Sequence, residues 1–191
     1  MNNENVIWAK SVILSYRYFE KICNAIDKSI EHMACNSFFN STLWAPINSI
    51  HNVSKRIIDM SQTKLEYINL KVLTNKILEN MDNKLSKVLI LKYIHNLKAT
   101  EVADLLKINI RTFFRKLNKA LSQFGSMMNK YGYNKEKMEI KFFNDDLIGS
   151  IYKKLLQETE KNEKKVKKVA LNNKVLSNKL EIENYLITKN A

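Results

Sequence analysis

A row of basic side chains near the middle of the chain has the residue types and the spacing to contact a polyanion. Arg111, Arg115 and Lys119 recur every four residues, so a helix places them in one row, with Thr112 and Lys116 beside it. The chain holds only four arginines among its 32 basic residues, and two of the four stand in this row. Arginine donates two parallel hydrogen bonds to a guanine edge or a phosphate, which lysine cannot do. The row therefore indicates contact with nucleic acid, and the alternative is an ordinary solvated basic face.

Helices must hold the basic row in place, and the pattern of residues 85–121 predicts three short helices. Apolar residues of 85–94 recur at three- and four-residue spacing, which is typical of a helix with one buried side. Asn96 follows at the expected helix end, because Asn tolerates the left-handed conformation of a C-terminal cap. The third helix is expected over 110–121. Its inward-facing residues are expected to be Phe114, Leu117 and Leu121.

The middle helix is expected to begin at Thr100, a good N-cap residue that is followed by Glu101 in the first turn. Ala103 is small at a position where two helices must cross closely. The apolar side of this helix is expected to hold Val102, Leu105 and Leu106. Residues 107–109 then form a turn. Two helices joined by three or four residues make a helix-turn-helix, in which the second helix can enter a major groove.

Several short motifs of this stretch follow one another in the order that one family uses. That family has Gly-Leu, Glu-Ile-Ala and Ile-Ser before a recognition helix. The corresponding residues here are Asn96-Leu97, Glu101-Val102-Ala103 and Ile108-Asn109, followed by Thr112, Phe114, Arg115 and Leu117. Residues 65–121, about 57 of 191, thus resemble region 4 of bacterial sigma-70-type factors, which reads the −35 promoter element. The resemblance implies a factor that reads duplex DNA and leaves contact with RNA polymerase open.

Two departures from the family pattern bear on this resemblance. Lys107 stands where Gly is common, so the turn needs either a left-handed non-glycine residue or a different geometry. Met81-Asp82 stands where Leu-Pro is usual. The acidic-aromatic helix of region 2, which melts promoters in sigma factors, is not recognised, so the resemblance does not extend to promoter opening.

These observations define a candidate DNA-binding site on helix 110–121 and the turn before it. Arg111, Thr112 and Arg115 are expected to face base edges, and Lys116 and Lys119 to lie nearer phosphates. Thr100 and the amides after it are expected to hold a backbone phosphate at a helix N-terminus. The full candidate set is Thr100, Asn109, Arg111, Thr112, Arg115, Lys116 and Lys119.

The net charge of +13 is unevenly distributed along the chain. Residues 84–121 carry nine basic and two acidic side chains, a net charge of +7. Residues 1–83 have a net charge of +1 and residues 122–191 a net charge of +5. Because more than half of the excess lies in one fifth of the chain, the charge favours a nucleic-acid partner over a merely well-solvated surface.

Only three glycines and one proline occur, so we expect an all-α fold, a helical bundle containing a central helix-turn-helix DNA-binding module. Three regions are expected. They are an N-terminal helical region (1–62) with an aromatic loop (36–50), the sigma region 4-like domain (63–130), and a charge-rich helical C-terminal region (131–191) for which partial disorder is the alternative.

Within these regions, periodicity predicts one long helix over 4–34 and renewed helix from about residue 52 to residue 78, divided near 61–63. The helix that starts near residue 110 is expected to run on to about residue 129, and Gly132 to end it.

No catalytic constellation is recognised, so we expect neither an enzyme nor a cofactor. Cys23, His32 and Cys35 offer three ligands of which Cys23 lies too far along the helix, and structural zinc normally needs four at tight spacing. We therefore expect no metal site. No basic leader with an apolar core is visible, and no apolar run approaches the roughly 18 residues of a membrane span. A cytoplasmic location and no membrane partner are expected.

Duplex DNA is the expected partner, and two other function classes stay open. The first is an RNA polymerase- or replication-associated adaptor, in which Phe38, Phe39 and Trp44 contact the partner protein. The second is an accessory protein that binds nucleic acid without sequence preference. The charged residues 159–191 are read as a solvated helix, with a homodimerisation helix or a basic arm along DNA as alternatives. The Asn, Lys and Ile content is typical of AT-rich bacterial coding sequences.

Overall fold

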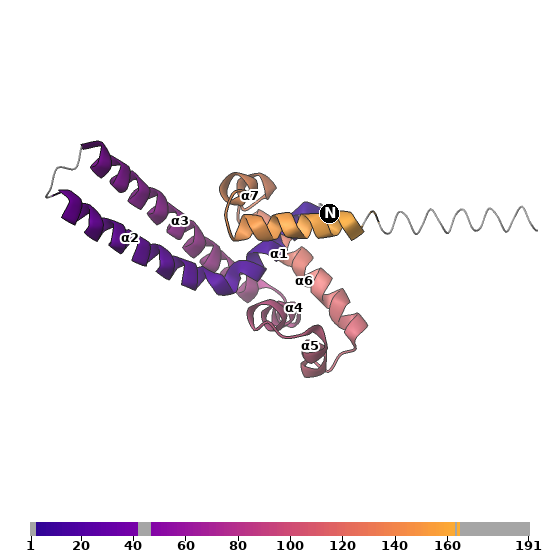
Figure 1. Ribbon diagram of the computed structural model, residues 1–191. Helices are drawn as coiled ribbons and strands as arrows, with labels where there is room; N and C mark the ends of the chain where they lie inside the picture. Colours follow the sequence, from indigo (N-terminus) through magenta and orange to yellow (C-terminus); the bar gives the residue numbers. More distant parts are fainter. Residues whose placement is uncertain (1–2, 42–46, 163, 165–191) are drawn as a thin grey trace, which may run out of the picture. The chain divides into compact units, whose positions relative to one another are not determined.

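The computed structural model describes residues 3–41, 47–162 and 164. All regular elements among these residues are helical, so the predicted all-α fold is confirmed (Figure 1). In chain order they are α1 (Asn3–Ser15), η1 (Tyr16–Tyr18), α2 (Phe19–Ser41), α3 (Ile47–Asn80), α4 (Asn83–Leu89), η2 (Ile90–Ile94), α5 (Ala99–Leu105), α6 (Ile110–Lys130) and α7 (Lys135–Phe142). The chain divides into two compact units after Ile151, and α1 to α7 all belong to the first. The described residues of the second unit, 152–162 and 164, are helical.

The helix α1 forms the centre of the first unit, and it contacts α3, α6, α7 and η2. Its side chains explain this position, because Trp8, Ala9, Val12 and Ile13 are almost fully buried. The close approach to α6 depends on Gly125, where an added Cβ would lie 3.1 Å from the Asn5 carbonyl oxygen and 3.4 Å from the Ala9 Cβ. A helix with apolar residues around most of its circumference is a core helix.

The helices α2 and α3 pack side by side as a hairpin (Figure 1). Two ion pairs cross between them. Lys64 Nζ lies 2.6 Å from Asp27 Oδ1, and Lys71 Nζ lies 3.2 Å from Glu20 Oε2. At the end nearer α1, Phe19 and Tyr67 are buried against each other with ring centroids 5.7 Å apart. The hairpin is therefore joined to the core at one end by aromatic packing.

The single helix predicted over 4–34 is wrong, since the 3-10 turn η1 separates α1 from α2. The Ser11 and Ser15 hydroxyls each donate to the carbonyl oxygen four residues earlier, at 2.8 Å, and such back-bonding bends helices. The two halves also pack on different helices, α1 on α6 and α2 on α3. The break thus reflects tertiary packing, because no glycine or proline marks it in the sequence.

Two further boundaries differ from the predictions. The division near residues 61–63 is absent, because α3 continues through them and the Ser61 and Thr63 hydroxyls donate to the carbonyls of Ile57 and Asp59. Helix also occupies much of the expected loop 36–50, since α2 runs to Ser41 and α3 starts at Ile47. Residues 42–46, and the side chains of Phe38, Phe39 and Trp44, lie outside the described part of the chain.

The helix α6 ends as predicted, with Gly132 in the left-handed conformation at φ 79°. After it, α7 returns toward α3, and the Tyr67 hydroxyl donates to Asp145 Oδ2 at 2.5 Å while Lys141 pairs with Glu66. Burial and the hydrogen bond to Asp145 raise the pKa of Tyr67, so its hydroxyl stays protonated as the donor. These contacts join α3 to the segment around α7.

Candidate nucleic-acid interface

The region that carries the candidate site begins with α4 and η2, which form the first of the three predicted helices. Asp82 caps α4, with its Oδ1 accepting from the Lys84 backbone N–H at 2.8 Å. The last turn, η2, is π-helical, and Tyr93 is buried there. Asn96 then adopts the left-handed conformation at φ 58°, which confirms the predicted helix end. Burial raises the pKa of Tyr93 to about 12.

The helix α5 starts earlier than predicted, and Thr100 is not its N-cap. The cap residue is Lys98, whose backbone N–H donates to Glu101 Oε2 at 2.7 Å. Glu101, at the third helical position, therefore accepts the hydrogen bond of the backbone N–H at the cap residue, and no capping hydroxyl is required for that bond. Thr100 lies in the first turn with its side chain exposed.

The inward side of α5 differs by one residue from the prediction. Val102 and Ala103 are buried, as expected for a close crossing, and Leu106 is half-buried. Leu105, however, is 63% exposed. Val102 and Leu106 lie one helical turn apart on the same side, whereas Leu105 falls outside that stripe.

The turn between α5 and α6 is four residues long, from Leu106 to Asn109, and the two helices contact each other. Lys107 is left-handed at φ 51°. Its N–H donates to the Asp104 carbonyl and the N–H of Ile108 donates to the Ala103 carbonyl, both at 3.0 Å. This pair of bonds is a Schellman-type helix end, in which glycine is the usual left-handed residue. Lys107 is therefore held in a strained left-handed conformation, and the turn does not adopt a different geometry.

Asn109 lies at the start of α6 and acts as its N-cap. Its Oδ1 accepts from the Thr112 backbone N–H at 2.7 Å. The side chain thus positions the first turn of α6, and its amide N–H groups are the atoms with which it can contact a ligand.

One of the three residues predicted to face the core from α6 is wrong. Phe113 is fully buried and Phe114 is 50% exposed, so the expectation that Phe114 faces inward is wrong. Leu117 and Leu121 are buried as predicted. Both phenylalanines fit a helical spacing to Leu117, so periodicity alone does not choose between them. The buried residues of α6 are Phe113, Leu117, Ala120, Leu121, Phe124, Gly125 and Met128.

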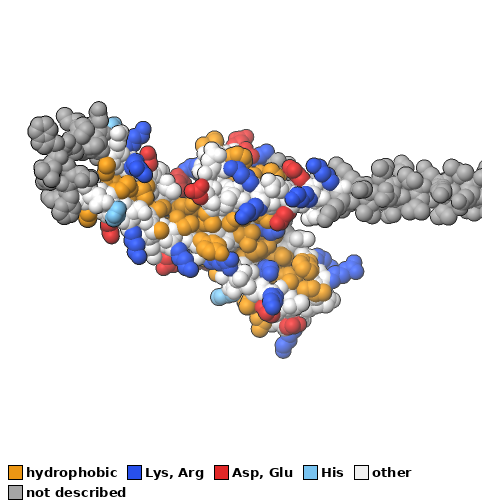
Figure 2. Space-filling view, in the orientation of Figure 1, with side chains coloured by type: hydrophobic (Ala, Val, Ile, Leu, Met, Phe, Trp, Pro, Cys, Tyr) orange, Lys and Arg blue, Asp and Glu red, His pale blue; other side chains and the backbone are white. Residues whose placement is uncertain are grey.

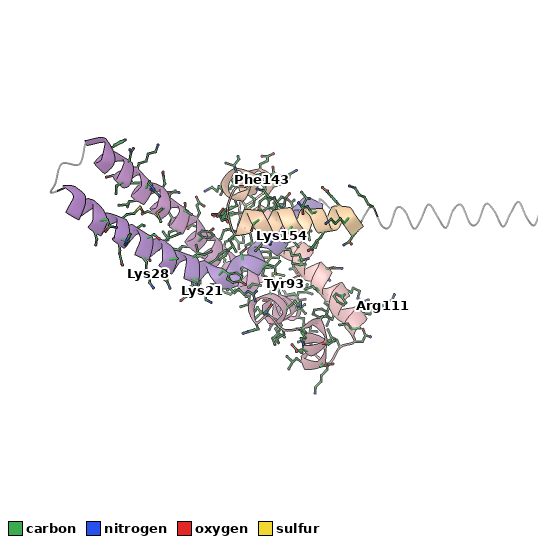
Figure 3. The ribbon with its side chains drawn as sticks, in the orientation of Figure 1. Lys21, Lys28, Tyr93, Arg111, Phe143 and Lys154 are labelled. Atoms are coloured by element: carbon green, nitrogen blue, oxygen red, sulfur yellow. The ribbon has the colours of Figure 1, made fainter. Side chains whose placement is uncertain are left out.

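The basic row lies on the opposite side of α6. The side chains of Arg111, Arg115 and Lys119 are all exposed, and those of Thr112 and Lys116 are half-buried along its edge. Figure 3 shows Arg111 extending from the first turns of α6 away from α5. The structure therefore brings these five predicted residues onto one helix face, with Asn109 at its beginning and Thr100 apart on α5.

Three exposed apolar residues accompany the basic row, and the sequence prediction missed them as part of this surface. They are Leu105, Ile110 and Phe114. Figure 2 shows apolar and basic side chains interleaved over α5 and α6. The Phe114 ring meets the buried Phe113 ring edge-on, with centroids 5.2 Å apart, which holds it in place at the surface. The phase of α6 gave no signal for this, because Phe113 and Phe114 both lie at helical spacing from the buried Leu117.

The other sequence features do not assemble into a second site within the described residues. Cys23 is half-buried, Cys35 is exposed, and the His32 ring contacts the Asn36 amide at 3.2 Å. No group of three or more His, Cys, Asp or Glu side chains suited to a metal ion occurs in the described part of the chain. Among the same residues, no helix combines the length and the apolar character that crossing a membrane requires.

Comparison with known proteins does not identify the chain. No protein-family model matches the sequence, and neither a curated protein nor a solved structure is significantly similar to it.

Proposed function

We propose that the protein is a sequence-specific regulator of transcription that binds duplex DNA by inserting the N-terminal half of α6 into the major groove. The observation that carries this proposal is the exposed row of Arg111, Arg115 and Lys119 on a helix that follows α5 after a four-residue turn. The sigma region 4-like order of motifs points to the same use of this helix. With this function the protein is expected in the cytoplasm.

The dimensions of the row suit a groove. Residues 111 to 119 span about 12 Å along a helix, which is close to the width of the major groove of B-form DNA. Arg111 and Arg115 lie nearest the N-terminus of α6, where recognition helices of helix-turn-helix proteins meet base edges. Lys116 and Lys119 lie further along α6, where they would be nearer the backbone phosphates of the DNA. Phe114 lies between the two arginines in the sequence, and its exposed ring suits apolar contact with a thymine methyl group.

The neighbouring residues support the same orientation. Asn109 fixes the start of α6 through its capping bond and still presents amide donors. Lys107 and Thr100 are exposed on the turn and on α5, where backbone phosphates would pass beside a helix in the groove. Thr100 acts in this arrangement as a hydroxyl donor from the first turn of α5, rather than as an N-cap.

Selection of random duplex DNA by the full chain, at about 50 and 200 mM salt, tests this function. We expect one motif to be enriched at both salt concentrations. The Arg111→Ala/Arg115→Ala variant should lose the motif, whereas Arg56→Ala, an exposed arginine on α3, should retain it. Binding at low salt without a motif would instead identify an accessory protein that binds nucleic acid without sequence preference.

A protein-binding function of the same surface is the second candidate. The exposure of Leu105, Ile110 and Phe114 favours it, because apolar side chains grouped on a surface often mark a protein contact. RNA polymerase is the partner that the family resemblance suggests. Recovery of polymerase by the full chain after nuclease treatment, and its loss with Phe114→Ser, would support this candidate over DNA reading.

A further inference from the structure

An open pocket of about 400 Å³ lies between α2 and α3, on residues that the basic row of α6 does not use. The two helices both contribute to its lining, which consists of Lys28, Ser29, His32, Met33, Arg56 and Met60. Figure 3 shows Lys28 on α2, further from α1 than Lys21 is. The pocket thus lies toward the outer end of the hairpin. We call it the hairpin pocket.

The hydrogen-bond donors of the hairpin pocket are basic side chains. Lys28, His32 and Arg56 line it and are exposed to solvent. The hydroxyl of Ser29 adds no donor, because its hydrogen goes to the Ala25 carbonyl oxygen at 2.9 Å. An ammonium and a guanidinium have donors and no acceptor, and an imidazole has at least one N–H group. The pocket therefore offers hydrogen bonds and positive charge to an anion.

The charges of Lys28 and Arg56 have no carboxylate partner within the described residues. Nearer the core, the two ion pairs of the hairpin match each lysine with a carboxylate of α2. Neither Lys28 nor Arg56 forms an ion pair in the part of the chain that the structure describes, and Glu31 and Asp59 do not line the pocket. Residues 32–58 contain no Asp or Glu at all. Cations held on two neighbouring helices without carboxylates create a positive potential, which a bound anion lowers.

The remaining lining of the hairpin pocket is apolar. Met33 of α2 and Met60 of α3 are half-buried, deeper than the basic side chains. Methionine is flexible and polarisable, and its sulfur makes favourable contacts with aromatic rings. The volume of about 400 Å³ falls within the range of roughly 300–1,000 Å³ that is usual for small-molecule sites. A phosphate group alone would fill only part of it, so the pocket has room for an organic body as well.

We propose that the hairpin pocket binds a small phosphate ester, with its phosphate on Lys28 and Arg56 and an aromatic or apolar body against Met33 and Met60. The guanidinium of Arg56 can donate two parallel hydrogen bonds to a phosphate, and Lys28 adds a point charge. Because a phosphate monoester carries close to two negative charges at neutral pH, it matches two cations better than a carboxylate does. The ligand belongs to the hairpin, so the proposal does not rest on DNA reading by α6.

Calorimetric titration of the full chain with adenosine monophosphate, inorganic phosphate and adenosine tests the proposal. We expect saturable binding of adenosine monophosphate, binding of inorganic phosphate that is roughly tenfold weaker, and no binding of adenosine. The Lys28→Gln/Arg56→Gln variant should lose the binding of adenosine monophosphate. The matched control is Lys21→Gln/Lys55→Gln, which removes the same charge from exposed positions of α2 and α3 outside the pocket and should bind as the native chain does. Because all four positions are exposed, both variants should keep their helix content by circular dichroism.

Three results would overturn the proposal. No saturable binding of adenosine monophosphate would exclude the ligand class for which this probe stands. Equal loss of binding in the two double variants would assign the effect to net charge rather than to the pocket. Equal affinities for adenosine monophosphate and inorganic phosphate would exclude a contact between the organic body and the methionines.

The affinity of the same variants for duplex DNA separates a small ester from the phosphates of a nucleic-acid backbone. We expect Lys28→Gln/Arg56→Gln and Lys21→Gln/Lys55→Gln to bind DNA equally, because both lower the net charge by the same amount. A loss confined to Lys28→Gln/Arg56→Gln would assign the pocket to a nucleic-acid backbone and overturn the small ester as its ligand. A chain that bound adenosine monophosphate as expected but selected no DNA motif would contradict the proposed function alone.

Discussion

Lys107 holds a backbone conformation that glycine adopts at lower cost. The left-handed region costs an L-residue roughly 1–2 kcal/mol, while glycine gains about 0.5–1 kcal/mol of unfolded-state entropy that opposes folding. We therefore expect Lys107→Gly, at φ 51°, to raise the free energy of unfolding by up to about 1 kcal/mol in urea denaturation. Lys107→Gln keeps the Cβ and removes the charge, so it should give no gain. An equal gain from both variants would attribute the effect to charge instead.

Arg115 distinguishes base reading from phosphate contact within the proposed interface. If it reads a base, Arg115→Ala should cost roughly 1–3 kcal/mol and relax specificity at one base step. If it contacts phosphate, affinity should fall evenly across sequences and the salt slope should shrink by about one. Titration of the selected duplex and of single-base variants at several salt concentrations separates the two. Affinity unchanged by this substitution would contradict both forms of the docking proposal.

The buried hydroxyl of Tyr93 is expected to make the free energy of unfolding depend on pH in the alkaline range. Burial raises its pKa from the ordinary value of 10.0 to about 12, so the folded chain holds the phenolic proton more tightly than the unfolded chain. Its contribution to stability is complete below pH 10.0 and is lost as the pH rises toward about 12. Tyr93→Phe should therefore flatten the fall in unfolding free energy over this window. Parallel curves for the two proteins would show that Tyr93 is not the group responsible.

For single residues, the sequence correctly predicted those positions where the conformation depends mainly on the residue itself. Asn96 and Gly132 end helices where expected, because left-handed caps depend on the residue itself. The exposed positions of Arg111 and Arg115 followed from helical spacing alone. The choice between Phe113 and Phe114 did not, because the buried residues of α6 lie midway between the two in helical projection and the packing of the neighbouring helices decides which one is covered.

At the scale of elements, the approach of α1 to α6 depends on the missing side chain of Gly125. A Cβ at this position already comes within 3.1 Å of the Asn5 carbonyl oxygen, so a larger side chain must separate the two helices. We expect Gly125→Leu to lower the free energy of unfolding by about 1–3 kcal/mol, the usual cost of overpacking. Ser126→Leu adds the same side chain at the next position of α6, which is exposed, and should change stability far less. Because leucine has a higher helix propensity than glycine or serine, helix propensity cannot explain a loss, and equal losses in chemical denaturation would contradict the packing explanation.

Helix lengths were the least predictable feature of the elements. No glycine or proline marks the turn η1 in the sequence. The turn arises where the packing partner changes, because α1 packs on α6 and α2 packs on α3. Conversely, the polar residues Ser61 and Thr63 resembled a break, yet α3 continues because their hydroxyls bond to its own carbonyls. The helices themselves were predictable from periodicity, whereas their ends depended on packing that acts over long sequence separations.

For the whole molecule, the symmetry of the selected DNA motif reports the oligomeric state in which the chain reads DNA. A two-fold dimer presents two symmetry-related α6 helices and should select an inverted repeat, whereas a monomer should select a single half-site.

The central position of α1 also has a consequence for how the chain is made. The ribosome synthesises α1 before its main neighbour, α6, which begins only at Ile110. At about 5–20 residues per second, the wait lasts roughly 5–20 s. During that interval Trp8 and Val12 have no α6 to cover them, and they are available to a chaperone. A fragment restricted to residues 63–130 would meet the converse problem, because α6 would then lack the surface that α1 supplies.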